Sequence, residues 1–405
     1  MIALSRSIRS LVPLLVATAA LAQSTPLDMR AALAMADSSN LDLRASRQQR
    51  AIALAGLSIA RQFPNPTLSF SAARDVPHES VVWDQPIEIG GKRGRRIEVA
   101  RQEQKVTEID IAVLARQIRH RTREAFYRVL LSREQTQQAK AALDISTRLK
   151  NIVQQRFEVG DVAELEVIQA DVEMARAQAE YEVTAQSQKS AEVQLAALLG
   201  APLDRPVILQ GQLNALPLAP DLPRVNELAL QSNADVQRTM QELATEQSRT
   251  RLAKAQRIPN LDLQGGVDLN APPDFQVGPR GQIGVNLPIF YHGQGEVAAS
   301  SSRVGFLQLS LQAQKTNAAS QAAAAYFDYI AKQTLASQYS NKVVPQTVKL
   351  EEMSEDSYRS GKTNLLPLID SQRRLNEVRR AYLDNLFAVQ SSFANLEEVL
   401  GAPLD

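Results

Sequence analysis

The stretches QRFEVGDVAELEVIQA…LAALLGAPLD (155–204) and DSYRSGKTNLLPLIDS…LEEVLGAPLD (356–405) are two copies of one unit. They align without a gap, because Gly160 and Gly361 lie 201 residues apart (361 − 160), as do the two closing GAPLD motifs. A long repeat has to be identified before any local assignment, since each copy predicts the structure of the other. The sequence therefore predicts that one architecture occurs twice in this chain of 405 residues.

The remaining parts of each half also match. Three pairs of segments correspond: SSNLDLRAS (38–46) with QSNADVQRT (231–239), FPNPTLSF (63–70) with IPNLDLQG (258–265), and QPIEIGG (85–91) with LPIFYHG (287–293). Each half is therefore expected to contain a helix, a strand, a loop, a strand and a very long helical hairpin. We assign the first repeat to residues 23–204, the second to 224–405, and a Pro- and Leu-rich crossover linker, with room for one short strand, to 205–223.

Residues 1–22 have the features of a secretory signal peptide. Arg6 and Arg9 precede an apolar run, LVPLLVATAALA, which ends in an A-x-A-like cleavage site before Gln23. A membrane anchor that stays attached is the alternative, but the run is shorter than the ~20 residues of a spanning helix. We expect the mature protein to lie outside the cytoplasm.

Charge and cysteine content exclude several classes of function. Without residues 1–22 the chain has 45 − 2 = 43 Lys and Arg against 44 Asp and Glu, whereas nucleic-acid binding normally needs a strongly basic face. The chain contains no cysteine, so neither disulfides nor a lipidated N-terminal Cys are expected. After residue 22 no apolar run approaches the length of a transmembrane helix, so residence in a membrane would depend on strands.

Four segments alternate between apolar and polar residues with the period of a β-strand. They are residues 67–73, 81–89, 261–269 and 283–289. The intervening NAPPDFQVGPRG (270–281) has the Pro and Gly of an exposed loop. Strands of about nine residues with one apolar and one polar face match a transmembrane β-barrel, in which Leu263, Val267, Val285 and Leu287 would face lipid. A small soluble sheet with one buried face would alternate in the same way.

The helices expected from the sequence are unusually long. Residues 97–157 and 161–199 contain neither Pro nor Gly, and a helix of about 60 residues spans ~90 Å. Such helices need partners along their length, and two stripes with coiled-coil spacing are candidate seams. The stripes are Leu375, Val378, Tyr382, Leu386, Val389, Phe393, Leu396 and Leu400 in the second hairpin, and Leu165, Ile168, Val172, Ala175 and Ala179 in the first. Residues 27–62 predict a helix or a broken pair of helices, and Pro345 predicts a break in the second hairpin.

Two halves that each join a pair of strands to a very long helical hairpin, behind a signal peptide, resemble the TolC family of outer-membrane efflux proteins. The resemblance covers the whole mature chain and rests on three sets of motifs. These are PNPTLSF and PNLDLQG entering the strands, QPIEIGGKRGRR and LPIFYHGQGE at the strand-to-helix junctions, and the turns FEVGDVAELEVIQA and YRSGKTNLLPLIDS.

The resemblance implies a mainly α-helical fold with a transmembrane β-barrel, completed as a homotrimer. Three chains would form a 12-stranded barrel in the outer membrane of a Gram-negative bacterium, and the helices would continue it as a tunnel through the periplasm. Four strands cannot close a barrel alone, and open edges are not tolerated in lipid. The implied partners are an inner-membrane pump of the resistance-nodulation-division type, a periplasmic adaptor (membrane fusion protein) and outer-membrane lipid, without nucleic acid.

We therefore predict a passive trimeric outer-membrane duct of a tripartite exporter, and not an enzyme. The stretch EIGGKRGRR (88–96) is most similar to the subfamily that serves heavy-metal pumps for cobalt, zinc and cadmium, so metal cations are one expected cargo. A duct of the same family for organic compounds or drugs is an alternative. So is a soluble periplasmic coiled-coil adaptor, although an adaptor would carry a single hairpin between halves of small β-domains. A secreted coiled-coil structural protein would not explain the alternating strands.

The sequence contains no constellation for catalysis, cofactor binding or a metal site. Its histidines, His78, His120 and His292, are far apart in the chain, and without cysteine no high-affinity zinc site is expected. The basic cluster Lys92–Arg96 would open a helix, where the macrodipole disfavours cations. It is either a solvated turn or a contact with anionic lipid headgroups.

The acidic residues near the hairpin turns form the candidate functional site. Gly160 and Gly361 mark the turns, because glycine suits the left-handed backbone that ends a helix. In the family these turns form the periplasmic tip, which is closed at rest, so the resemblance implies a gate there. The candidate gate residues are Asp161, Glu164, Glu166 and Asp370. The equivalent of Glu166 in the second copy is Pro367, which removes one acidic ring. Solvation of the helix surface is the alternative role of these acids.

Overall fold

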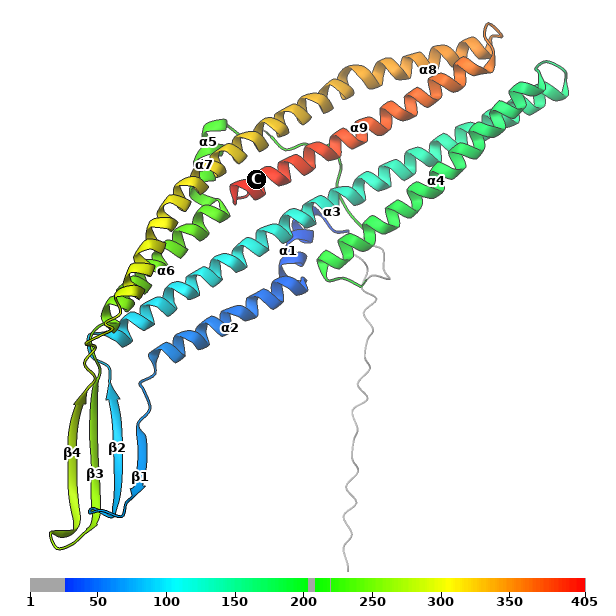
Figure 1. Cartoon of the computed structure of the whole chain (residues 1–405). Coiled ribbons are helices and arrows are strands. Elements are labelled where there is room, and N and C mark those ends of the chain that lie inside the picture. Colours follow the sequence, from blue (N-terminus) through cyan, green and yellow to red (C-terminus); the bar gives the residue numbers. More distant parts are fainter. Residues whose placement is uncertain (1–25, 203–207, 219, 405) are drawn as a thin grey trace, which may run out of the picture.

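The computed structural model describes residues 26–202, 208–218 and 220–404. The predicted signal peptide (1–22) therefore lies outside the described residues. The molecule is elongated, with a four-stranded sheet at one end and two hairpin turns at the opposite end (Figure 1). Long helices run side by side between these two ends.

The two halves contain corresponding elements in the same order. The first half contains α1 (Met29–Ser39), α2 (Leu41–Arg61), β1 (Thr67–Ala72), β2 (Glu79–Ile87), α3 (Lys92–Glu158) and α4 (Glu164–Leu199). The second contains α5 (Leu222–Ser232), α6 (Ala234–Gln256), β3 (Leu261–Ala271), β4 (Phe275–Val285), α7 (Gln294–Gln338), a π-helical segment (Tyr339–Val343), α8 (Val344–Arg359) and α9 (Leu365–Leu400). The prediction of a mainly helical fold with a small sheet is confirmed.

An asparagine breaks the helix that precedes the strands in each half. Asn40 separates α1 from α2, and Asn233 separates α5 from α6; each side-chain oxygen accepts the N–H three residues later at 3.1 Å. Each side-chain amide also donates to a carbonyl near the end of a hairpin helix, Asn40 to Leu198 (3.0 Å) and Asn233 to Val399 (2.8 Å). The broken pair of helices predicted in 27–62 is confirmed, and the same cap recurs in the second half.

β1, β2, β3 and β4 form one antiparallel sheet in chain order, so the strand pairs of the two halves join edge to edge. β2 begins at Glu79, two residues before the predicted start, and β4 begins at Phe275, well before position 283. Most of the segment 270–281, which we expected to be an exposed loop, is therefore strand. Pro279 and the glycines around it interrupt the alternation of β4, and the strand accommodates them because it lies at an edge of the sheet.

The register puts most of the apolar side chains of the four strands on one face, with Val82 as an exception. One row across the sheet contains Phe70, Val81, Val267 and Pro279, and the next contains Leu68, Trp83, Gly265 and Gly281. A row on the opposite face contains Thr67, Asp84, Gln264 and Gln282. Leu263, Val267 and Val285 share the apolar face, whereas Leu287 lies beyond the end of β4. Many of these apolar side chains remain exposed, so other described parts of the chain do not cover this face.

α3 is the central helix of the body. It is 67 residues long and packs against α2, α4, α6 and α9, which confirms the uninterrupted helix predicted for 97–157. The seam predicted along α9 is also confirmed. Its buried members are Leu375, Leu386, Val389, Phe393, Leu396 and Leu400. Among the helices of the described segments, none is both long and apolar enough to cross a membrane.

The seam predicted on α4 is wrong for contacts within the chain. Leu165, Ile168 and Val172 are 63%, 54% and 57% exposed, and Ala175 and Ala179 are exposed as well. α4 packs on α3 through its opposite face. The buried residues of that face include Ala170, Ala191, Leu195 and Leu199. Both faces carry small and aliphatic residues at helical spacing, so periodicity alone could not decide which one packs inside the chain.

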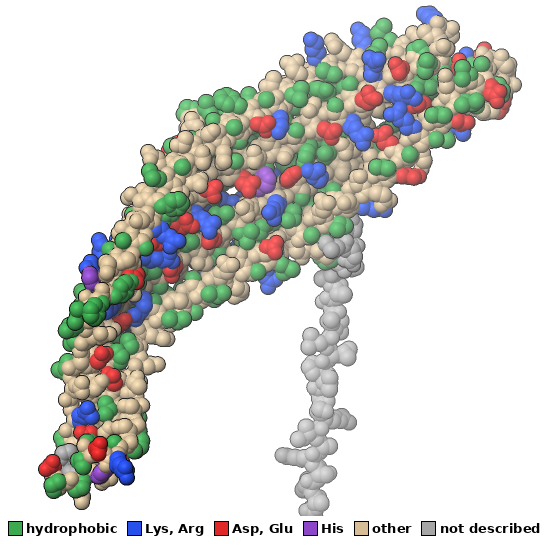
Figure 2. Space-filling view, in the orientation of Figure 1, with side chains coloured by type: hydrophobic (Ala, Val, Ile, Leu, Met, Phe, Trp, Pro, Cys, Tyr) green, Lys and Arg blue, Asp and Glu red, His purple; other side chains and the backbone are tan. Residues whose placement is uncertain are grey.

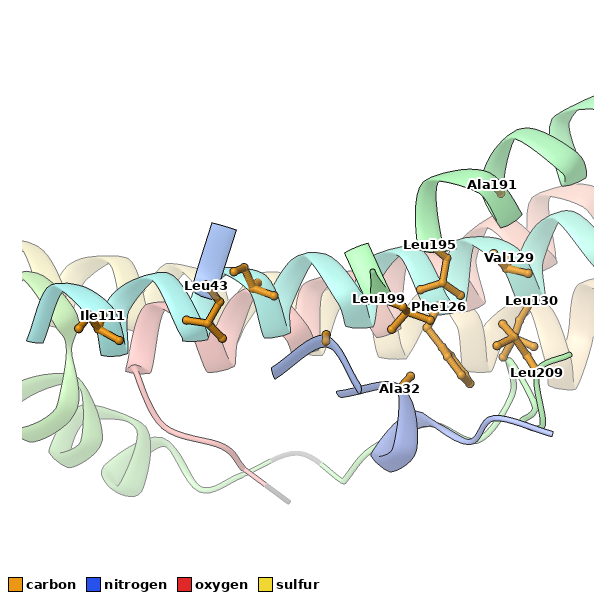
Figure 3. Packing of buried hydrophobic residues seen from close by; sticks show 12 residues of the cluster. Ala32, Leu43, Ile111, Phe126, Val129, Leu130, Ala191, Leu195, Leu199 and Leu209 are labelled. Atoms are coloured by element: carbon orange, nitrogen blue, oxygen red, sulfur yellow. The ribbon is translucent and has the colours of Figure 1, made fainter. Parts of the chain in front are cut away.

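A large hydrophobic cluster surrounds the middle of α3, where α1, α2, α4 and the linker converge (Figure 3). Its members include Ala32, Leu43, Ile111, Phe126, Val129, Leu130, Ala191, Leu195, Leu199 and Leu209. The linker enters this cluster at Leu209, which forms an isolated parallel bridge with Leu27. This bridge is the only part of the described linker residues that resembles the expected short strand.

Hydrogen bonds hold the next part of the linker to α7 and α9. Gln390 Nε2 donates to the carbonyl oxygens of Leu213 (3.3 Å) and Ala215 (2.8 Å), and Tyr329 Oη donates to the carbonyl oxygen of Pro217 (2.5 Å). Tyr329 is fully buried, and this burial raises its pKa to about 12. The linker therefore fastens the two halves together at the middle of the molecule.

The second hairpin departs from α-helical geometry at the place predicted from Pro345, but the helix does not divide into two pieces there: its backbone stays right-handed helical from α7 through the π-helical segment into α8. The π-helical segment precedes α8, and Pro345 lies in the first turn of α8. Proline lacks the backbone N–H that an α-helix needs in its interior, and the π-helical segment is the local irregularity through which the continuous helix accommodates it.

Candidate functional site: the hairpin tips

Both hairpins end in the same turn. Gly160 and Gly361 lie just beyond α3 and α8, with left-handed φ values of +80° and +69°. Each glycine N–H bonds to the carbonyl three residues earlier, at 2.9 and 3.0 Å, and the following N–H bonds to the carbonyl five residues earlier, at 2.8 and 3.0 Å. This pair of bonds is the Schellman motif, and the positive φ explains why both copies have glycine here.

The first tip carries three of the predicted acids. Glu164 and Glu166 lie in the first turn of α4, where the helix macrodipole favours carboxylates. Asp161 lies in the turn itself and pairs with Arg156 of α3, with 2.7 Å between Oδ2 and Nε. This hydrogen bond raises the pKa of Arg156. The helix macrodipole and the ion pair with Arg156 therefore explain in part why this tip has several acidic residues.

Glu166 also connects the first hairpin to the second. Its Oε2 accepts a hydrogen bond from Tyr358 Oη of α8 at 3.5 Å. Tyr358 is buried, and the guanidinium carbon of Arg156 lies 5.3 Å from the centre of its ring. Burial, with a further contribution from the Glu166 carboxylate, raises the pKa of Tyr358. One aromatic side chain of the second hairpin thus contacts both helices of the first.

The two hairpins are packed together beneath these turns. The buried cluster there contains Leu149, Val153, Ala170, Tyr358, Leu365, Leu368 and Ile369. Farther from the turns, α4 and α9 are joined by the ion pairs Glu173–Arg373 and Glu180–Arg380, the latter at 2.6 Å. A cavity of about 150 Å³ lies beside these pairs, between α3, α4 and α9. Figure 2 shows acidic and basic side chains interspersed over this end of the molecule.

Within one chain, Asp370 does not take part in the network of contacts that contains Asp161 and Glu166. Its side chain is 63% exposed, and its carboxylate lies 3.8 Å from Arg374, one turn along α9. Its neighbours Leu368 and Ile369 are buried against the first hairpin, so Asp370 occupies the outward side of α9. The structure thus places Asp161 and Glu166 in one network and leaves Asp370 on a separate exposed surface.

The sequence-based prediction missed Tyr358 and the ion pairs. A signal for Tyr358 existed, because an aromatic residue lies three positions before the glycine in both copies, as Phe157 and Tyr358. The ion pair between Glu173 and Arg373 had no such signal. It depends on which faces of α4 and α9 meet, and helical periodicity does not contain that information.

The basic side chains at the start of α3 make more contacts within the chain than the side chains of a solvated turn would. Lys92 is buried, and Arg96 forms an ion pair with Glu88 at 2.5 Å. Arg93 and Arg96 donate to backbone carbonyls at the end of α2 at 2.8 to 3.2 Å, where the negative end of that helix dipole favours cations. Arg95 remains exposed. The cluster therefore fastens α3 to α2 and leaves only part of its charge to solvent.

No group of three or more His, Asp or Glu side chains in the described residues is arranged to hold a metal ion. His120 lies closest to carboxylates, with Nδ1 3.4 Å from Glu398 Oε2 and Nε2 3.9 Å from Glu124 Oε2. The two carboxylates approach opposite nitrogens of the ring, so they cannot share one ion with it. This contact ties α3 to α9.

Comparison with known proteins agrees with the duplicated plan. A family model described as outer membrane efflux protein matches residues 32–201 and 225–402. The chain is 26% identical over 379 residues to the cobalt-zinc-cadmium resistance protein CzcC of Cupriavidus metallidurans, covering 93% of this chain and 90% of CzcC. It is 24% identical over 341 residues to the pyoverdine export outer membrane protein OpmQ of Pseudomonas aeruginosa, covering 82% of this chain and 69% of OpmQ. Among solved structures, CusC has the same fold, with a TM-score of 0.77, 18% identity, and coverage of 93% of this chain and 92% of CusC.

Proposed function

Because this chain belongs to the outer membrane efflux protein family, whose model matches both halves, we propose that it is the trimeric outer-membrane duct of a tripartite exporter. Family membership carries the location in the outer membrane and the role in efflux. One feature of the chain supports the trimer. The sheet has two outer strands that lack a second neighbour, and the helical body has two borders with exposed apolar side chains.

The sheet supports closure by further copies. β1 and β4 are its outer strands, and each leaves a row of backbone N–H and C=O groups unpaired, which lipid does not tolerate. Pairing β4 of one chain with β1 of the next satisfies both rows. Three chains with four strands each then close a 12-stranded barrel, and its apolar face points outward.

The helical body also has two borders with exposed apolar side chains. Near the tips, α4 presents the exposed Leu165 and Val172 on one side, and α8 presents the exposed Leu350 and Met353 on the other. Figure 1 places α4 and α8 at opposite borders of the body. When two unlike surfaces of neighbouring copies pack together, they form a head-to-tail interface, and such an interface closes into a ring when the rotation permits. The α4 stripe is therefore a seam between chains.

In this assembly the hairpin tips form the periplasmic end of the duct. A periplasmic adaptor and an inner-membrane pump of the resistance-nodulation-division type would engage that end. The acids Asp161, Glu164, Glu166 and Asp370 would then form rings around the axis of the tip. A ring of like charges in a narrow pore attracts cations, so this end would act as a cation-selective gate.

We propose heavy-metal cations as the cargo, because the similarity to CzcC extends over most of both chains. Organic compounds are the second candidate, since OpmQ is a pyoverdine export protein. Deletion and complementation would separate the two. Loss of resistance to cobalt, zinc and cadmium without loss of organic-compound export supports the metal, and the reverse result supports the organic cargo.

The trimer is tested by enlarging one residue of the α4 stripe. In Ala179→Trp, the new side chain leaves the fold of each chain intact because Ala179 is exposed, but it overpacks the seam by about 1–3 kcal/mol. Gln178→Trp is the matched control, since Gln178 is also exposed and is turned by about 100° along the helix. Light scattering in detergent should give a trimer for wild type and Gln178→Trp, and a smaller species for Ala179→Trp. A folded wild-type monomer under the same conditions rules out the proposed assembly.

A further inference from the structure

Two ion pairs bridge α4 and α9 across α3. Glu173 pairs with Arg373, and Glu180 pairs with Arg380 at 2.6 Å. α3 packs against both α4 and α9 (Figure 1), so the paired side chains reach past α3 to meet. In both pairs the acid is on α4 and the base is on α9, and the pairs lie seven residues apart, about 10 Å along each helix. The two bridges therefore leave room between them.

A cavity of about 150 Å³ lies beside the two bridges, between α3, α4 and α9. All four bridging residues line it, and its apolar lining comes from the same three helices. The apolar residues are Ala139, Ala142, Ile145, Ala177, Ile369 and Leu375. α3 and α4 contribute mainly alanine here, and these short side chains leave space that larger ones would fill. A cavity of this volume holds one benzene-sized ring.

Most of the charged residues that line the cavity have partners within the chain. They are four arginines and four glutamates, and the two bridges account for half of them. Glu351 of α8 accepts a hydrogen bond from Gln372 and is attracted by Arg379. In the part of the chain that the structure describes, the side chains of Arg176 and Glu377 form neither an ion pair nor a hydrogen bond.

Arg176 and Glu377 lie at the same level, between the two bridges. On α4, Arg176 comes three residues after Glu173, and on α9, Glu377 comes four residues after Arg373. Both side chains are exposed, so they lie at the mouth of the cavity. Their polarity is the reverse of that of the bridges, because here the base is on α4 and the acid is on α9. The mouth therefore presents a cation without a partner on one side and an anion without a partner on the other.

We propose that this cavity binds a small aromatic zwitterion, with its ring against the apolar lining, its carboxylate on Arg176 and its ammonium group on Glu377. Charge complementarity selects this class of ligand. An aromatic anion would leave Glu377 unpaired beside its own negative charge, and an aromatic cation would do the same to Arg176. The bound zwitterion forms a third bridge between α4 and α9. The inference concerns a single chain, so it does not depend on the proposed function.

Three probes that differ by one charged group test the proposal. They are L-phenylalanine, 3-phenylpropionate, which lacks the ammonium group, and phenethylamine, which lacks the carboxylate. Saturation-transfer NMR titrations use the full-length protein in detergent. L-Phenylalanine should bind about two- to fivefold more tightly than either analogue, the factor that one exposed ion pair contributes. Its ring protons should receive more saturation than its α proton, because the ring enters the cavity.

Two outcomes with the wild-type protein overturn the proposal. One is that none of the three probes binds. The other is that either analogue binds as tightly as L-phenylalanine, since the missing charged group then makes no contact.

The two charged contacts can be removed separately. Arg176→Gln should weaken L-phenylalanine binding about two- to fivefold without weakening phenethylamine binding, and Glu377→Gln should weaken L-phenylalanine binding without weakening 3-phenylpropionate binding. Lys189→Gln is the matched control, because Lys189 is an exposed cation on α4 that does not line the cavity. Equal weakening in Arg176→Gln and Lys189→Gln contradicts the contact with Arg176, because the effect is then one of net charge.

The place of the ring is tested by filling the cavity. In Ala142→Leu the larger side chain takes up part of the space, so binding of all three probes should fall at least about tenfold. Ala141→Leu is the control, because Ala141 is exposed, does not line the cavity and is turned by about 100° along α3. Unchanged binding in Ala142→Leu puts the probes elsewhere on the protein and overturns the inference. If Ala142→Leu does not fold, the probe series and the charge variants still decide.

Discussion

The hydroxyl of Tyr358 in α8 donates a hydrogen bond to the Glu166 carboxylate of α4, with 3.5 Å between Oη and Oε2, at the end of the molecule farthest from the sheet. The donor is buried, and the acceptor lies in the first turn of α4, in the other hairpin. This bond therefore links the two hairpins at the tip, which is the proposed position of the gate. The apolar cluster around Tyr358 holds the ring in place, so the hydroxyl can be removed without repacking the tip.

Tyr358→Phe should loosen the contact between the hairpins. The ring and its packing remain, while the hydrogen bond to Glu166 is lost, at a cost of about 1 kcal/mol. We expect faster amide hydrogen exchange in both turns, around Gly160 and Gly361, and a higher open probability in planar bilayers. Glu166→Gln is the control, because the amide oxygen can still accept the bond. Exchange in Tyr358→Phe that is as slow as in wild type at both turns excludes this hydrogen bond as a restraint.

Charge on the apolar face of the sheet should be tolerated far less than charge on the polar face. Val267 lies in the row with Phe70 and Val81, away from both ends of the strands, so Val267→Lys should cost about 2–4 kcal/mol in a barrel embedded in lipid. Gln264→Lys places the same charge on the opposite face and should cost little. Val285 is a weaker test, because the structure puts it in the last row, next to the helices.

The two lysine variants can be compared by urea unfolding after refolding into vesicles. Similar midpoints for Val267→Lys and Gln264→Lys would mean that neither face contacts lipid, and would count against the barrel.

The sequence predicted features that depend on residues close in the chain better than features that depend on distant residues. The glycine turns and the uninterrupted α3 depend on residues close in the chain, and both appear at the predicted places. Pro345 also marks an irregularity where one was predicted, but the helix continues there through a π-helical segment. The start of β4 did not appear at the predicted place, because Pro279 and nearby glycines conceal a strand that only its partner β3 defines. Local patterns thus predicted the elements better than their edges.

Tertiary partners explain the remaining differences. α4 has two apolar faces, and the sequence alone could not show that the stripe with Leu165 and Val172 is the one left outside. The partners of Arg93 and Arg96 are backbone carbonyls at the end of α2, which no pattern in the basic cluster reveals. The candidate gate acids were recognisable from their place after each glycine, whereas their link to Tyr358 required the packing of both hairpins.

Tyr329 predicts a loss of stability at alkaline pH. Burial raises its pKa from 10 to about 12, so the unfolded chain ionises this tyrosine near pH 10 while the folded chain keeps it neutral. The stability that depends on the neutral form is complete below pH 10 and is lost as the pH rises through 12, by at most about 3 kcal/mol.

This pH dependence can be isolated with Tyr329→Phe. The variant loses the hydrogen bond to the Pro217 carbonyl at every pH, but its melting temperature should fall less steeply above pH 10 than that of wild type. Tyr326→Phe, on the same helix and only half-buried, should retain the wild-type slope. An unchanged slope in Tyr329→Phe would show that other groups cause the alkaline destabilisation.

Asp370 should contribute to cation selectivity at the tip without contributing to the stability of the chain. Its carboxylate is exposed and lies 3.8 Å from Arg374, and exposed pairs at this spacing stabilise a helix by less than about 0.5 kcal/mol. In a trimer, three copies around the axis form a ring of negative charge, which attracts cations and binds multivalent ones. Asp370→Asn should therefore reduce cation selectivity and weaken block by multivalent cations from the tip side, with a nearly unchanged melting temperature.

Planar-bilayer recordings with a matched control decide whether Asp370 acts at a gate. Glu377→Gln removes the same charge from an exposed residue two turns farther along α9, so it should change selectivity less if the constriction lies at the tip. Wild-type selectivity and blocking affinity in Asp370→Asn would assign Asp370 to the solvated helix surface. Equal changes in the two variants would mean that the whole tunnel, and not a ring at its end, selects cations. A larger change in Asp370→Asn, with the trimer intact by light scattering, locates the constriction within about two helical turns of Asp370, because screening limits the reach of one carboxylate to about 8–10 Å.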